Sequence, residues 1–137
     1  MQTSSILTEY DLMREVARHL SGEKIRLRMH RPSDCDGLTW CDELGRLTID
    51  ISPDLDDEVM VYVLLHETAH CLHHTFRPVT ERVMQASPLS KTLIYNIRED
   101  QADHQAKIWL QYGEQHRDWS MNYFQGVLTP LLTYKDG

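Results

Sequence analysis

The strongest constraint on the fold is a nearly uninterrupted apolar segment, Val59 to Leu65, which runs directly into a cluster of histidines. The tripeptide Ser-Pro-Asp at residues 52–54 is typical of a helix start, because proline suits the first helical position and acidic residues suit the first turn. The sequence therefore predicts a helix from about Asp54 to about His74. A helix that is apolar on all sides is buried, so polar side chains near its end need partners.

The end of this predicted helix carries His66-Glu67-Thr68-Ala69-His70, the pattern H-E-x-x-H. Residues four apart lie on nearly the same helix face, one turn apart, so His66 and His70 can bind one metal ion. Glu67 projects between them and can act as a general base on a water molecule at that ion. The pattern thus predicts two metal ligands and one base. The competing interpretation is a helix end that reaches the surface and carries solvated histidines.

A catalytic zinc site needs a third protein ligand and one open position. A histidine ten residues after His66 is excluded, because that position is Phe76. His73 and His74 lie on the same predicted helix, and a straight helix cannot wrap three successive turns around one ion. We therefore interpret His74 as a neighbour of the site or as a residue of the helix end, where an imidazole suits the helix dipole.

A carboxylate on the following helix is the favoured third ligand. Glu99 and Asp103 are four residues apart, and Ala102 and Ala106 lie on the same side, where small side chains let two helices approach. We expect Glu99 to bind the ion and Asp103 to accept a hydrogen bond from a ligand imidazole. Asp103 or His104 could replace Glu99 as the ligand. Without the nearby motif, both carboxylates would be interpreted as solvated charges.

Helix signals occur at three other places. An apolar stripe follows Thr8, a capping residue, and stops before Gly22, which suits the position after a helix. Pro88 opens a later helix that Gly113 is expected to close. The aromatic and apolar residues near the C-terminus predict a short packed helix that ends at Pro130: Trp119, Tyr123, Phe124 and Leu128.

Strand signals lie between the first two predicted helices. Residues 24–30 and 46–51 alternate between apolar and polar side chains, which is typical of half-buried strands. Residues 38–41 predict a shorter strand, and residues 42–45 predict a turn. The sequence therefore predicts an α+β fold in which a sheet of about three strands accompanies the helices.

Length, charge and cysteine content narrow the class of protein. The 137 residues suit one domain, 1–137, whose core we place at about residues 24–112. The formal net charge of −7 disfavours direct binding to nucleic acid. No apolar run approaches the roughly 20 residues that cross a membrane, and no secretion signal is evident. An odd number of cysteines then predicts free thiols and a cytoplasmic location: Cys35, Cys41 and Cys71.

The metal motif and the helix after it resemble the ImmA/IrrE-type zinc metallopeptidase domain. The resemblance rests on residues 66–70 and on the pattern E-x-x-A-D-x-x-A that begins at Glu99, and it spans roughly residues 24–110. It implies a compact zincin-like fold, a Zn²⁺ cofactor and hydrolysis of a peptide bond. Some members of that family cut helix-turn-helix repressors of mobile elements or stress responses, which implies a DNA-binding protein as the substrate.

The sequence thus favours a zinc metalloendopeptidase that acts on one specific protein, and an acidic enzyme would attract a basic repressor. One alternative is a metal-binding interaction protein, such as a phage or toxin–antitoxin component, that keeps the fold and cuts nothing. Another is a structural protein without metal. Glu67 favours the enzyme, because a protein that only binds needs no general base. Five residues are equal candidates for stabilising the oxyanion: Tyr95, Arg98, Tyr112, His116 and Tyr123.

Overall fold

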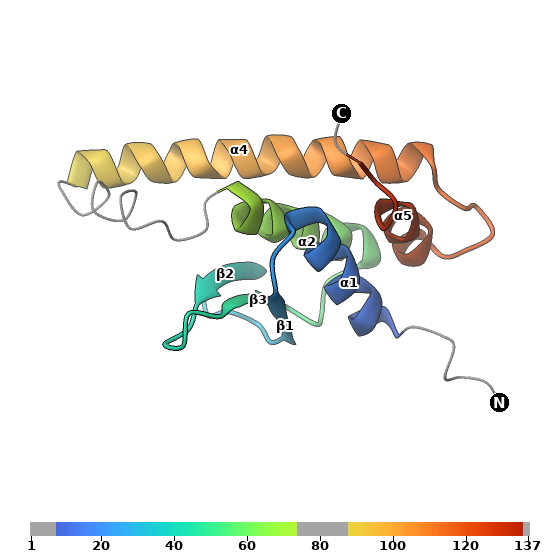
Figure 1. Cartoon of the computed structure of the whole chain (residues 1–137), viewed down its shortest axis with the longest axis horizontal. Coiled ribbons are helices and arrows are strands. Elements are labelled where there is room, and N and C mark those ends of the chain that lie inside the picture. The colour runs from blue at the N-terminus through green and yellow to red at the C-terminus, as the bar shows by residue number, and fades with distance from the viewer. Residues whose placement is uncertain (1–7, 74–87, 136–137) are drawn as a thin grey trace.

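The computed structural model describes residues 8–73 and 88–135, which form four α-helices and a three-stranded sheet (Figure 1). The elements follow one another as α1 (Glu9–Ser21), β1 (Ile25–Met29), β2 (Gly37–Cys41), β3 (Leu47–Ile51), α2 (Asp57–His73), α4 (Pro88–Gln115) and α5 (Tyr123–Leu131). The predicted α+β class is therefore confirmed. Within these two stretches, no helix combines the length and apolar character needed to cross a membrane.

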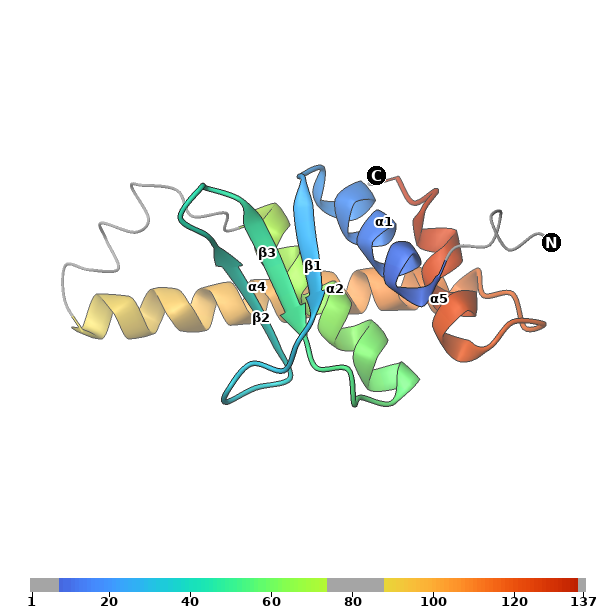
Figure 2. The same ribbon diagram turned by 90° about the horizontal axis from the view of Figure 1, so that it is seen from below.

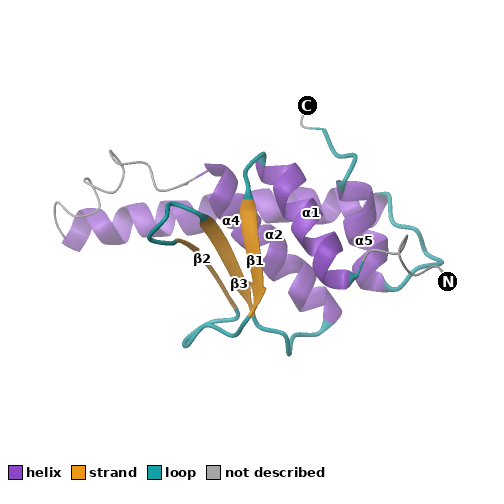
Figure 3. Ribbon diagram, turned by 60° about the horizontal axis from the view of Figure 1, so that its bottom comes forward, coloured by secondary structure: helices purple, strands orange, loops and turns teal. Residues whose placement is uncertain are grey.

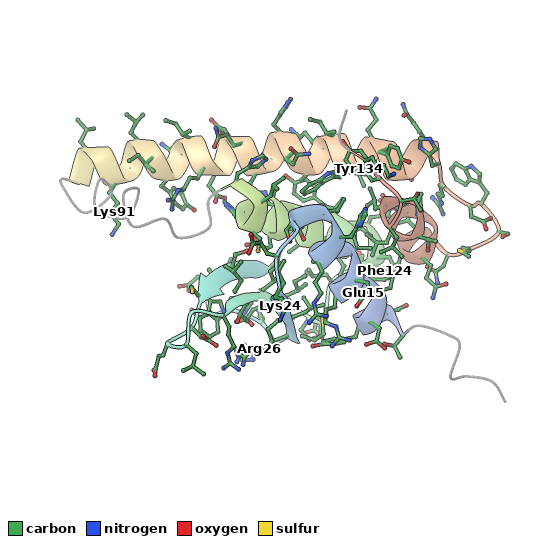
Figure 4. All side chains as sticks on the ribbon, viewed as in Figure 1. Glu15, Lys24, Arg26, Lys91, Phe124 and Tyr134 are labelled. Atoms are coloured by element: carbon green, nitrogen blue, oxygen red, sulfur yellow. The ribbon has the colours of Figure 1, made fainter. Side chains whose placement is uncertain are left out.

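The elements are arranged around α2. In Figure 1, α4 runs along one side of α2 and the sheet lies on the other. Figure 3 shows the helices gathered on one side of the sheet, with α1 and α5 close to α2. The core forms where these elements meet, and its largest buried side chains include Leu27, Ile49, Leu64, Trp109 and Phe124, the last of which is labelled in Figure 4.

β3 is the central strand of the sheet, with β1 parallel to it and β2 antiparallel (Figure 2). In β1 the predicted alternation is confirmed, because Ile25 and Leu27 are buried whereas Arg26 is on the face turned away from α2 (Figure 4). In β3 all five residues are buried, polar and apolar alike. The prediction of a half-buried strand was therefore wrong for β3. β2 lies at the edge of the sheet, next to α2.

The buried residues of β3 include a carboxylate. Asp50 is only 4% exposed, and Arg28 donates two hydrogen bonds to it, from Nε at 2.7 Å and from Nη2 at 3.2 Å. Trp40 Nε1 donates a third at 3.0 Å. A buried carboxylate needs such donors, and here they come from the two neighbouring strands. Because Arg28, Trp40 and Asp50 come from three adjacent strands, their hydrogen bonds help to fix the register of the sheet on its outer face.

α2 is the buried helix that the apolar segment predicts, but it begins later than expected. Residues 53–55 form a turn, and the helix starts at Asp57. The prediction of a start near Asp54 was wrong, because proline followed by acidic residues suits a turn as well as a first helical turn. The first intrahelical bond runs from the Met60 N–H to the carbonyl of Asp56, at 2.8 Å. His74 lies outside the described residues.

α1 begins and ends as predicted. The Thr8 hydroxyl accepts a hydrogen bond from the Asp11 N–H at 3.0 Å, which caps the first turn. Gly22 has φ 71°, a left-handed conformation that favours glycine, and its N–H donates to the carbonyl of Arg18 at 2.9 Å. The turn at residues 42–45 is confirmed as well, with Gly45 at φ 79°.

Gly113 does not close α4, which continues to Gln115, so that prediction was wrong. Its role is to let α5 approach, because a Cβ atom at this position would lie 2.6 Å from the carbonyl oxygen of Val127. α5 begins at an Asn122 cap and contains Pro130 in its last turn. Trp119 precedes α5 and is 76% exposed, so the prediction that it belongs to the packed helix was also wrong.

Substituting alanine at Gly113 is expected to destabilise the fold. The added methyl group overlaps backbone atoms of α5, and overpacking of this kind costs about 1–3 kcal/mol in the free energy of unfolding. Urea unfolding of Gly113→Ala measures the change. The exposed Gln111→Ala on the same helix is the control and should stay within about 0.5 kcal/mol of wild type. Equal stability of the two variants would contradict a close contact between α4 and α5.

Candidate metal centre

Three side chains from two helices converge at one point, as the sequence predicts. α2 supplies His66 and His70, whose Nε2 atoms lie 3.2 Å apart. α4 supplies Glu99, with Oε1 at 3.2 Å from His66 Nε2 and Oε2 at 2.8 Å from His70 Nε2. One ligand atom from each residue lies within 4.8 Å of the others, so this cluster could hold a metal ion.

The spacing of these atoms suits a tetrahedral ion. Zinc–ligand bonds of about 2.0–2.1 Å at tetrahedral angles place neighbouring ligand atoms about 3.3 Å apart. The contact of 3.2 Å between the two imidazole nitrogens agrees with that value. The two contacts to Glu99 run to different oxygens, Oε1 at 3.2 Å from His66 and Oε2 at 2.8 Å from His70, so a single-oxygen ligand requires a small turn of the carboxylate. Two imidazoles and one carboxylate are also a donor set that zinc commonly takes in catalytic sites.

Burial favours the form of the ligands that binds metal. Removal from water lowers the pKa of His70 below that of an ordinary histidine, although the nearby Glu99 carboxylate opposes this shift. The neutral imidazole is the form whose nitrogen can coordinate an ion. The apolar setting of α2 therefore prepares the histidine for a metal instead of a proton.

Glu67 lies beside this cluster, on the face of α2 that meets β2. Its side chain is 8% exposed, and the Thr39 hydroxyl donates a hydrogen bond to its Oε1 at 2.7 Å. Burial raises the pKa of Glu67 above the ordinary glutamate value, while the hydrogen bond from Thr39 acts in the opposite direction. A carboxylate with a raised pKa is a stronger base, so the environment suits the role that the motif predicts.

Asp103 lies next to a ligand imidazole, as expected, but without the predicted hydrogen bond. Its Oδ1 is 3.3 Å from His66 Nδ1, and that nitrogen is buried without an aligned hydrogen-bond partner among the described residues. The Tyr62 hydroxyl donates a hydrogen bond to the same Oδ1. Tyr62 precedes His66 by one helical turn of α2. The three side chains therefore form a row in which Asp103 of α4 lies between Tyr62 and His66.

We expect the phenol of Tyr62 to support metal binding through this row. Removing the hydroxyl in Tyr62→Phe frees Asp103 to turn away from His66, which should weaken zinc binding by about tenfold. Competition with a chromophoric chelator measures the affinity. Tyr95→Phe is the matched control, because Tyr95 lines the same cleft. Equal affinities for both variants would remove Tyr62 from the site.

The cluster forms part of the wall of an open cleft of about 430 Å³ between α2, α4 and β2. Of the five candidates for oxyanion stabilisation, Tyr95 and Arg98 line this cleft. The others lie elsewhere on the described part of the chain: Tyr112 stacks on His116, with ring centroids 4.1 Å apart, and Tyr123 lies beneath Arg117. The structure thus reduces the candidates to two.

The remaining candidates on the two helices take other positions. His104 is exposed and outside the cluster, and His73 Nε2 lies 3.2 Å from Gln105 Oε1. Ala102 and Ala106 are fully buried, which confirms that small residues line the side of α4 facing the core. Among the residues described, Glu99 is therefore the carboxylate that joins the two histidines.

Among the described residues, no cysteine belongs to a cluster that could hold a metal ion. Cys35 precedes β2, and its thiol donates a hydrogen bond to the Gly37 carbonyl. Cys41 is the last residue of β2, a strand of five residues that spans about 13 Å. Cys71 is buried in the core, and burial raises its pKa to about 12, which keeps the thiol protonated at neutral pH. All three cysteines lie in the described part of the chain, and none of them forms a disulfide.

Two residues of the site are absent from the sequence interpretation. Tyr62 had a local signal, because it stands four residues before His66 and hence on the same helix face. Thr39 had no such local signal, because its contact with Glu67 depends on how the sheet packs against α2.

The chain matches no family model, no curated protein and no solved structure.

Proposed function

We propose that this protein is a zinc-dependent metallopeptidase with a zincin-like fold. The observation that carries the proposal is the convergence of His66, His70 and Glu99 on the wall of an open cleft, beside the buried carboxylate of Glu67. When bound there, zinc would polarise the carbonyl of a peptide bond and acidify a water molecule. Two histidines and one glutamate suit Zn²⁺ better than harder ions such as Mg²⁺.

The chain's own groups can supply the remaining chemistry. Glu67 accepts a proton from the attacking water and delivers it to the leaving amine. Tyr95 and Arg98 line the cleft and can donate to the oxygen on which negative charge develops. Residues 37–39 of the edge strand β2 line the cleft as well, so an extended substrate can pair with that strand through its backbone.

The first test uses protein purified without a histidine tag. We expect about one zinc ion per chain, hydrolysis of a peptide library, loss of hydrolysis after removal of the metal by a chelator, and recovery when zinc is added back. Protein that purifies without metal and gains no activity with zinc would contradict the proposal. Bound zinc without hydrolysis of any peptide or protein would favour the metal-binding interaction protein instead.

We further propose that the substrate is a basic protein, with a DNA-binding repressor as one example. Apart from the proposed zinc ligand Glu99 and the base Glu67, the described residues that line the cleft carry the carboxylates Asp36 and Asp103 against the single cation Arg98, and the whole chain carries a net charge of −7. Such a surface attracts basic segments and repels acidic ones. Zinc-loaded enzyme should cut the repressor-like protein encoded beside its gene faster than casein. Faster digestion of casein would contradict this substrate class.

A further inference from the structure

The edge strand β2 holds the carboxylate of Glu67 from one side. Thr39 pairs with the buried Ile49 across the sheet, so both side chains share the face that meets α2. The Thr39 hydroxyl lies 2.7 Å from Glu67 Oε1 and 3.1 Å from the Glu67 main-chain oxygen. Both oxygens are acceptors, so the hydroxyl proton is directed at Glu67, and its nearer partner is the carboxylate.

Gly37 restricts the same carboxylate from a second direction. It stands two residues before Thr39 on β2 and therefore on the same face. A Cβ atom at Gly37 would come within 2.5 Å of Val63 Cγ1, 3.2 Å of Glu67 Cγ and 3.4 Å of Glu67 Oε2. The bare backbone of Gly37 thus fits against the stem of the glutamate, while Thr39 bonds its Oε1. A side chain between these two contacts has few alternative rotamers.

Glu67 lines the cleft, and because Thr39 bonds its Oε1, Oε2 is the carboxylate oxygen left to accept a proton. Both Gly37 and Thr39 also line the cleft, so the strand that contacts the base is available to contact a substrate. A base must lie within hydrogen-bond reach of the proton that it removes, and misplacement by 1 Å can reduce turnover about 100-fold. The hydrogen bond at Oε1 therefore bears directly on where the free oxygen points.

We propose that Thr39 is a positioning residue, which holds the Glu67 carboxylate in the orientation needed for proton transfer. The proposal rests on the peptidase function proposed above. It assigns β2 two tasks: the outer edge of the strand pairs with the substrate backbone, and the face toward α2 fixes the base. The same strand then positions both the substrate and the base, so the distance between them varies little.

The kinetic test compares three variants as zinc-loaded, full-length protein. Thr39→Val keeps the shape of the side chain but removes the hydroxyl, and we expect kcat to fall about 10- to 100-fold with KM within about twofold and zinc content unchanged. Thr39→Ser restores the hydroxyl and should recover most of the turnover. Thr48→Val is the matched control, because Thr48 is a buried threonine of the neighbouring strand whose hydroxyl has no hydrogen-bond partner among the described residues.

A thermodynamic test works without activity. Thr39→Val should lower the urea midpoint of the wild-type protein, but should change it much less in Glu67→Met, where no carboxylate remains to be held. Equal shifts in both backgrounds would overturn the proposal, as would a kcat of Thr39→Val equal to that of Thr48→Val. A wild-type protein that hydrolyses nothing but shows this coupling would overturn the peptidase function while leaving Thr39 as the residue that holds Glu67.

Discussion

Glu67→Gln is expected to abolish peptide hydrolysis while leaving one zinc ion bound per chain. The amide has nearly the same shape and can still accept the hydrogen bond from Thr39, so the fold and the metal ligands stay in place. It cannot take a proton from water at neutral pH, and the loss of a general base reduces turnover about 100- to 10,000-fold. Initial rates of peptide cleavage, together with the zinc content of the same sample, measure both effects.

The matched control for this change is Glu15→Gln on α1, which alters the net charge by the same amount. Glu15 is half exposed and does not line the cleft. Its variant should therefore retain the wild-type rate. Wild-type turnover by Glu67→Gln would show that another group removes the proton, and the general-base assignment would then be wrong.

Glu99→Ala is expected to remove most of the zinc. Glu99 contributes the only carboxylate in the three-residue cluster formed by the described residues, and it bridges to both histidines at 3.2 Å and 2.8 Å. Residues that merely support a ligand contribute roughly 10- to 100-fold to metal affinity, and the loss of a ligand should exceed that range. Equilibrium competition with a chromophoric chelator gives the affinity, and circular dichroism checks that α4 still forms.

Asp100→Ala separates this effect from a general loss of negative charge. Asp100 is the next residue on α4, is exposed, and lies outside the cluster. We expect its variant to bind zinc as the wild-type protein does. If Glu99→Ala and Asp100→Ala bind zinc equally well, then the third ligand is not Glu99.

The grouping of His66, His70 and Glu99 could be predicted because the relevant geometry is local. Two histidines four residues apart share a face in any α-helix, whatever surrounds it. The carboxylate was harder to choose, but the buried Ala102 and Ala106 identify the side of α4 that approaches the core. Helix periodicity and side-chain size can be obtained directly from the sequence, and these two features predicted which side chains meet in the cluster.

The errors come from residues whose meaning depends on distant neighbours. Glycine after a helical pattern commonly ends a helix, yet Gly113 stays helical, and Val127 of α5 lies so close to it that a side chain would not fit. The charge of Asp50 suggests an exposed position, but Arg28 and Trp40 from adjacent strands allow it to be buried. The contact from Thr39 to Glu67 is of the same kind. Pairings across the fold leave no periodic signal in a single sequence.

The origin of the three ligands on two helices has a consequence for the stability of the chain. An ion shared by His66 and Glu99 would tie together residues 33 positions apart, much as a covalent cross-link would. Binding that is specific to the folded state adds RT ln(1 + [L]/Kd) to the free energy of unfolding, or about 2.7 kcal/mol when free zinc is 100 times Kd. The thermal midpoint should therefore rise with the zinc supply, and scarcity of the ion would loosen α4 from α2 and expose the chain to degradation.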